Sequence, residues 1–190
     1  ANASNPELQS GSTVTYDGTA GPYTVKDYTY HHLTFNGSGG VFNLGAAESI
    51  AGNLTITAGT FDIEGFNLTV TGTFSNNDKL RLQGGETTVS LTNDTDSGTV
   101  EYDGTGSYTG LKAGNAYNNL IFNGTGGTFT LGAALDVNDT LTVTAGTLDV
   151  SASNYGITAK SWTDTGAGTF TEGTGTVTFD VAGGTINANE

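Results

Sequence analysis

Apolar and polar residues alternate along most of the chain that follows residue 11. The clearest stretches keep a period of two residues and are Thr13–Tyr16, Asn53–Thr57, Asn67–Thr71, Lys79–Gln83 and Thr140–Thr144. This alternation is typical of strands that bury one face, and the abundant threonine suits a pleated surface. No useful length of sequence carries apolar residues at helical spacing. The pattern predicts an all-β protein.

The chain repeats itself internally. Residues 118–150 align without a gap on residues 31–63, and 18 of the 33 positions are identical. A short phrase, Thr-Val-Thr-Tyr or a close variant, follows Ser12, Gly98 and Gly175. We therefore predict a polar tail at 1–11, a first unit at 12–97, a second unit at 98–174 and the start of a third unit at 175–190.

Two architectures fit such units. No common repeat is this long, so each unit is expected to hold three or four turns of about 20–25 residues. In a parallel β-solenoid (a right-handed β-helix), stacked coils would bury columns of apolar residues. In a β-sandwich with strand exchange, Asn36-Gly37 and Asn123-Gly124 would make hairpins. The repetition and the regularly spaced glycines favour the solenoid.

Four phenylalanines occupy matched positions of the two units. They are Phe35 and Phe42 in the first unit and Phe122 and Phe129 in the second. In a solenoid, matched inward positions stack on one another. We predict that these four side chains are buried in stacked columns.

The composition narrows the classes of partner. The 190 residues include 30 glycines, no cysteine, 19 acidic residues and only five basic ones, so the formal net charge is −14. Nucleic acids and anionic membranes both favour clustered lysine and arginine, which excludes them as expected partners. No apolar run reaches the length of a membrane span. A start at Ala1-Asn2-Ala3 is expected for a mature exported protein whose leader has been removed.

Several phrases resemble a repeat of very large secreted bacterial surface proteins, which are described as β-strand-repeat or adhesin-like. These phrases lie at Gly98–Gly104, Tyr117–Phe122, Asp139–Val150, Asn67–Val70 and Gly173–Phe179. The resemblance covers nearly all of the chain beyond residue 11. It implies a right-handed β-helix outside the cell that serves as a stalk or scaffold, and it is a poor guide to activity.

Two pairs of residues are candidates for chemistry. His31 and His32 are adjacent, so on a strand their imidazoles would point to opposite faces and would not share a metal ion. The second unit has asparagines there, and we interpret the histidines as plain surface residues. Asp62 and Glu64 have the spacing of a carboxylate pair on one face, as a glycosidase needs. The second unit does not reproduce that pair, so a carbohydrate-active enzyme is the less favoured hypothesis and no catalytic residue is assigned.

A loosely bound structural calcium ion is the one cofactor hypothesis. Asp94 and Asp96, with Asn76-Asn77-Asp78, offer oxygen ligands of the kind calcium prefers. No complete calcium loop is present, so solvated loop carboxylates are the default interpretation.

Two further patterns concern the surface. Threonines at alternate positions could order water or bind ice if they stacked on consecutive turns, as Thr55/Thr57, Thr69/Thr71, Thr142/Thr144 and Thr176/Thr178 would have to do. Asn-x-Ser/Thr sequons, which are candidates for glycosylation in a secreted chain, occur at Asn2, Asn36, Asn53, Asn67, Asn93, Asn123 and Asn138.

We expect an extracellular structural protein, a subunit of a surface filament or stalk that assembles head to tail with copies of itself. An open strand edge invites another chain, and the recurring phrase supplies such edges. The expected self-assembly residues are Gly175, Thr176, Val177, Thr178 and Phe179 on one side and Thr13, Val14 and Tyr16 on the other. An adhesin module that binds surface glycans or ice is the alternative.

Overall fold

The structure is a computed structural model that describes residues 8–180 and the backbone of residues 186–187. Its described part contains strands and no helix. The strands are β1 (Thr13–Tyr16), β2 (Tyr23–Val25), β3 (His32–Leu44), β4 (Glu48–Ile50), β5 (Leu54–Asp62), β6 (Leu68–Val70), β7 (Phe74–Asn76), β8 (Lys79–Leu82), β9 (Val89–Ser90), β10 (Thr99–Tyr102), β11 (Ser107–Thr109), β12 (Ala116–Tyr117), β13 (Asn119–Thr130), β14 (Leu135–Asp149), β15 (Ile157–Asp164), β16 (Gly168–Thr171), β17 (Val177–Phe179) and β18 (Ile186–Asn187).

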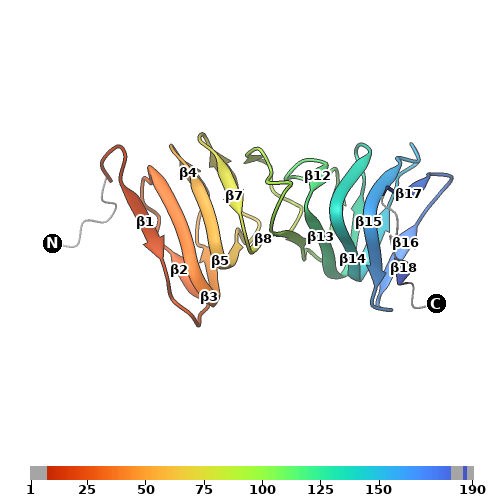
Figure 1. Ribbon diagram of the computed structural model, residues 1–190, viewed down its shortest axis with the longest axis horizontal. Coiled ribbons are helices and arrows are strands. Elements are labelled where there is room, and N and C mark those ends of the chain that lie inside the picture. The colour runs from red at the N-terminus through yellow and green to blue at the C-terminus, as the bar shows by residue number, and fades with distance from the viewer. Residues whose placement is uncertain (1–7, 181–185, 188–190) are drawn as a thin grey trace.

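The strands form a parallel β-solenoid. Paired residues on neighbouring coils lie 19 to 24 positions apart in the sequence, from Thr13 beside His32 to Trp162 beside Ile186. Figure 1 shows the strands side by side along the long axis, with the N-terminal coil at one end and the C-terminal coil at the other. Every pairing in the described part is parallel, so the sandwich alternative was wrong and the solenoid prediction is confirmed.

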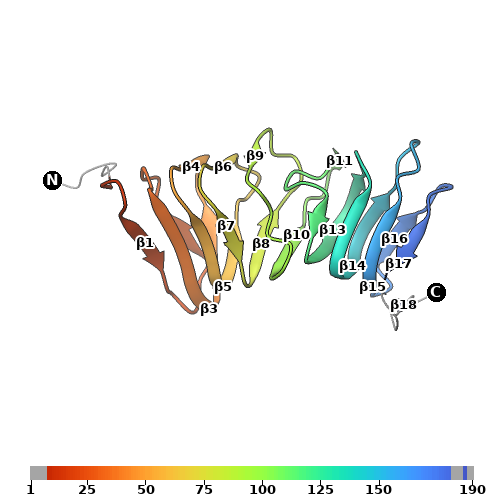
Figure 2. The same ribbon diagram turned by 45° about the horizontal axis from the view of Figure 1, so that its top comes forward.

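One ladder of paired strands, which we call face B, runs unbroken from end to end. It passes through β2, β3, β5, β8, β10, β13, β14, β15 and β18. A second ladder, face A, passes through β1, β3, β5 and β7 and resumes at β12, β14, β15 and β17. The third side carries β4, β6 and β9 in the first half and β11, β13, β14 and β16 in the second (Figure 2).

Inward side chains stack in columns along the axis. Phe35, Phe42, Phe122 and Phe129 are all at most 1% exposed, which confirms their predicted burial. The ring centroids of Phe35 and Phe61, on successive coils, lie 4.4 Å apart. Stacked aromatic pairs at this distance add to the hydrophobic stabilisation.

Asn36-Gly37 and Asn123-Gly124 do not form the hairpins that the alternative required. Each lies inside one long strand, β3 or β13, at a shift of register that turns the chain from one face to the next. A Cβ on Gly37 would lie 2.0 Å from the carbonyl oxygen of Gly18, and one on Gly124 would lie 1.9 Å from that of Gly104. Only glycine allows the coils to approach this closely. The two Asn-Gly pairs therefore mark corners of the coil and not hairpin turns.

Asparagine side chains bridge successive coils at other corners. The side-chain oxygen of Asn53 accepts a hydrogen bond from the backbone of Thr73, and that of Asn67 accepts from Thr87 and Thr88. The same bond joins Asn154 to Thr174 in the second half. At the corners these backbone N–H groups have no acceptor on a neighbouring strand, and the asparagine oxygens accept their hydrogen bonds instead.

Glu48 is an acidic residue at an inward position. It is only 8% exposed, and the matched residue of the second unit is Leu135, which is 1% exposed. Burial raises the pKa of Glu48 to about 7, against an ordinary value of 4.5, and the negative charge of Asp27 adds to the shift. The folded state therefore holds this proton more tightly than the unfolded chain does.

We expect Glu48 to make the protein less stable as the pH rises. Its contribution is fully present below pH 4.5 and is lost as the pH passes through about 7, with an amplitude on the order of 2 kcal/mol. Urea unfolding at pH 5 and pH 8 should show this difference, and Glu48→Gln should reduce it. Glu172→Gln, on an exposed residue, is the control. Equal pH dependence in the wild type and Glu48→Gln would contradict the assignment.

Candidate functional site at the two ends of the solenoid

The N-terminal end of the solenoid exposes the edge of β1. Within the described residues β1 pairs only with β3, so its other edge is open. Thr13 and Thr15 are exposed, whereas Val14 and Tyr16 point inward and are half-buried. In the same described part of the chain β2 also pairs with β3 alone, so its other edge is open as well, and Tyr23 there is 39% exposed.

The C-terminal end exposes the edge of β17 in the same way. In the part of the chain that the structure describes, β17 pairs only with β15. Val177 and Phe179 are half-buried, and Thr178 between them is exposed. Gly175, half-buried, and Thr176, exposed, precede the strand. The expected self-assembly residues thus lie at the two ends of the solenoid, which Figure 1 shows far apart.

The middle copy of the phrase shows how this strand packs when coils lie on both sides. β10 lies between β8 and β13, where Val100 is 2% exposed and Tyr102 is fully buried. The hydroxyl of Tyr102 is 3.2 Å from that of Tyr117, and the matched hydroxyls of Tyr16 and Tyr30 are 2.8 Å apart. The same internal arrangement therefore recurs at the N-terminal end without a covering coil.

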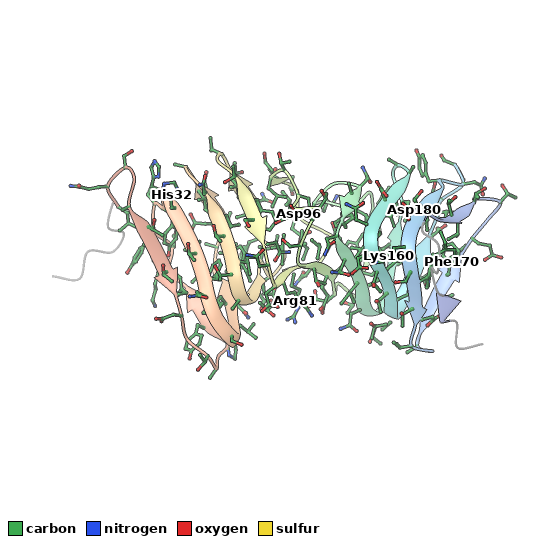
Figure 3. All side chains as sticks on the ribbon, in the orientation of Figure 1. His32, Arg81, Asp96, Lys160, Phe170 and Asp180 are labelled. Atoms are coloured by element: carbon green, nitrogen blue, oxygen red, sulfur yellow. The ribbon has the colours of Figure 1, made fainter. Side chains whose placement is uncertain are left out.

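A cluster of charges joins the two halves of the solenoid, and the sequence analysis missed it. Arg81 on β8 contacts Asp62 at 3.2 Å, Glu101 at 3.4 Å and Asp103 at 3.7 Å. Lys79 forms an ion pair with Glu101. Arg81 lies near the middle of the molecule (Figure 3). Its partners are about 20 residues away in each direction, so the coil period was the signal that could have found them.

The cluster contains more acidic than basic groups. Burial and, to a smaller extent, the negative charge of Asp62 raise the pKa of Asp103 to about 6, although the charge of Arg81 opposes the shift. Burial would also raise the pKa of Glu101, but the hydrogen bond and charge of Lys79 outweigh it and hold that pKa below its usual value. The two basic residues thus compensate only part of the buried negative charge.

Replacing Arg81 should destabilise the junction between the halves. Arg81→Met leaves Asp62, Glu101 and Asp103 facing one another, at an expected cost of about 2 kcal/mol in denaturant unfolding at pH 7.5. The loss should shrink near pH 4, where the carboxylates take up protons. Lys160→Met is the control, because Lys160 and Asp139 form an exposed pair at 2.9 Å that should contribute less than about 0.5 kcal/mol. Equal losses in both variants would argue against a structural role for the cluster.

The two histidines were expected to point to opposite faces, and they do not. Their ring centroids are 4.4 Å apart in an edge-on arrangement, because His31 precedes β3 and does not share its pleat. The His32 Nδ1 accepts a hydrogen bond of 2.9 Å from the backbone of Asn53. In the second unit the side-chain oxygen of Asn119 accepts the matched bond from Thr140. His32 is thus another corner acceptor.

Changing both histidines to asparagine should be nearly neutral. His31→Asn/His32→Asn reproduces the residues of the second unit and keeps an acceptor for Asn53, so its unfolding free energy should lie within about 0.5 kcal/mol of the wild type. His31→Asn/His32→Ala removes the acceptor and should cost about 1 kcal/mol more. Thermal or urea unfolding measures both. A large loss in the first variant would show that the imidazoles have a role of their own.

The proposed calcium ligands bond to the protein itself. The Asp94 carboxylate accepts a hydrogen bond of 2.8 Å from the backbone of Asn76 on the preceding coil, and Asp78 accepts one of 2.6 Å from Gly59. The hydrogen bonds that Asp94 receives outweigh its burial and lower its pKa. Asp96, beside Asp94, has a raised pKa because the two carboxyls interact. Among the described residues, no group of acidic or histidine side chains is arranged to hold a metal ion.

Asp62 belongs to a tight turn that both units share. Its carboxylate accepts a hydrogen bond of 2.8 Å from the backbone of Glu64, and Asp149 accepts a matched bond from Ser151. Glu64 and Ser151 both adopt a positive φ, of 51° and 65°. Aspartate favours such turns because its side chain bonds the backbone two residues on. This gives Asp62 a structural role.

The threonine pairs named from the sequence do not lie in one register, but other hydroxyl residues do. On the third side of the second half, Ser107, Thr128, Thr147 and Thr169 lie side by side on successive coils. A parallel row holds Thr109, Thr130, Asp149 and Thr171. Asp149 interrupts this row, and a glycan-binding or ice-binding face remains a prediction.

Most of the sequon asparagines take part in the coil-to-coil bonds. The side-chain nitrogens of Asn93, Asn123 and Asn138 donate hydrogen bonds to Ala116, Glu101 and Thr95. Asn53 and Asn67 use their oxygens, as described above. Asn36 is exposed, and Asn2 lies outside the described residues. Asn53, Asn123 and Asn138 are exposed as well, so exposure does not single out one sequon, and glycosylation stays a prediction.

Comparisons with known proteins add no relative. No family model, no curated protein and no solved structure matches the chain. Within the described residues no helix is long and apolar enough to span a membrane.

Proposed function

We propose that this chain is an extracellular structural protein, a subunit of a surface filament or stalk that grows by stacking copies head to tail. The observation that carries the proposal is that, among the described residues, the strand at each end is paired along one edge only. The two strands have nearly the same sequence, Thr-Val-Thr-Tyr in β1 and Thr-Val-Thr-Phe ending at Phe179. One copy can then extend the coil stack of another by strand addition. Because such a contact uses different surfaces on the two partners, it does not close on itself and yields a filament.

The open edges offer matched hydrogen-bonding groups. The backbone N–H of His32 donates to the carbonyl of Ser12, so the alternation along β1 directs the N–H of Thr15 away from β3. The N–H of Ile157 donates to the carbonyl of Thr176, so the backbone groups of Val177 point away from β15. In a parallel contact, Thr15 of one copy would donate to Val177 of the next.

The lateral surface supports the same function. Nineteen acidic residues against five basic ones make the sides of neighbouring filaments repel one another, which keeps them apart at low salt. The backbone hydrogen bonds and buried apolar residues at the ends are less sensitive to salt. Growth along the axis is therefore favoured over lateral clumping.

A proline at the open edge tests the proposal. Thr15→Pro removes the N–H that the contact requires but that the isolated coil does not use, so the subunit should fold normally and assembly should need at least a ten-fold higher concentration. Thr15→Val keeps the N–H and is the matched control. Sedimentation velocity and negative-stain microscopy at about 150 mM salt measure assembly, and circular dichroism checks the fold. A wild type that stays monomeric at high concentration, or a folded Thr15→Pro that assembles as the wild type does, would refute the proposal.

A further inference from the structure

The repeated phrase does not always lie on the same face of the solenoid. β1 lies on face A, β10 lies on face B, and β17 lies on face A again. The second unit therefore begins one face further around the axis than the first, and the third phrase returns to the starting face. The first and last copies of the phrase thus share a face although the middle copy does not.

Face A can be followed through the junction where it contains no strand. Asp94 accepts a hydrogen bond from Asn76 on β7, and the adjacent Asn93 donates one of 2.8 Å to Ala116 on β12. From β12 the paired strands lead through β14 and β15 to β17. The segment around Asp94 thus connects the two parts of face A.

The first and last coils also have the same internal spacing. On the first coil, Val14 on face A precedes Tyr23 on face B by nine residues, and on the last coil Val177 precedes Ile186 by nine. Along face B, Tyr23 and Ile186 are separated by eight coil-to-coil steps without interruption. The two ends therefore present strand edges at the same two faces.

From this geometry we infer that copies stack without rotation, with β1 of one copy on β17 of the next and β2 on β18. The inference rests on the proposed function and adds the register of the contact. Val14 would then lie beside Val177 and Tyr16 beside Phe179. The latter contact extends an aromatic column that already holds Tyr16 and Phe35, whose centroids are 5.7 Å apart.

The junction inside the chain defines the competing register. There, the phrase at β10 is placed on β8, one face further around. If copies stacked with the same rotation, β1 would lie on β18 and β2 on β16. The edge of β17 would then receive neither strand, although it carries the half-buried Val177 and Phe179. Stacking without rotation instead covers β17 and β18 and leaves the edge of β16, with the half-buried Phe170, to neither strand. We favour it because the nine-residue spacing between face A and face B is the same on the first and last coils.

Disulfide trapping distinguishes the two registers, because the chain has no cysteine of its own. Outward residues on adjacent parallel strands lie about 4.8 Å apart, which suits a disulfide. Thr15→Cys/Thr178→Cys should link copies stacked without rotation, and Thr24→Cys/Thr171→Cys should link rotated copies. All four threonines are exposed, and each pair spans the two ends of the molecule, so the bonds form between copies.

After mild oxidation, Thr15→Cys/Thr178→Cys should give a ladder of multimers on a non-reducing gel, at least five-fold above the dimer formed by either single variant. The rotated pair should remain at the level of its own single variants. A ladder from the rotated pair alone would overturn the register and leave the proposed function standing. Filaments without a ladder from either pair would overturn the register as well. If neither pair gives a ladder and the wild type forms no filaments, the proposed function is overturned together with the inference.

Discussion

The backbone hydrogen bond between successive coils is the interaction on which the rest of this structure depends. Each coil of about 20 residues is too short and too polar to bury its inward side chains alone, and it becomes stable only against a neighbour. Where the strands are interrupted, as at the corners, asparagine or histidine side chains accept the N–H groups that the ladder leaves over. The fold is thus a one-dimensional array in which each coil both needs and provides a surface.

Burial within this array changes the energetics of charged residues. Arg81 lies among carboxylates from the coils before and after its own, and Glu48 occupies an inward position that is leucine in the second unit. Glu48 has no acidic counterpart at the matched position of the second unit, and Arg81 lies outside the residues that align between the units. The repeat therefore provides the scaffold, and departures from the repeat create the local electrostatics.

The alternation of residues and the internal repeat were sufficient to predict the parallel solenoid, its coil length and the buried phenylalanines. The first and last copies of the repeated phrase, which form β1 and β17, also drew attention to the two strand edges. The sequence did not predict the corners, because an Asn-Gly pair has the same signature in a hairpin as in the bend within β3. The geometry of His31 and His32 was missed because it depends on where β3 begins, and the charge cluster was missed because it depends on coil register. The alternation of apolar and polar residues determines neither the first residue of a strand nor the register between coils.

The offset between sequence unit and coil has a consequence for how such a protein can lengthen. Adding a unit like 12–97 extends the stack by about four coils and also turns the next unit by one face around the axis. A side chain that is outward in every unit would then be displayed along a spiral, facing a new direction at each repeat. Duplication or loss of units would change which directions around the stalk carry a given feature, without any change in the residues that display it.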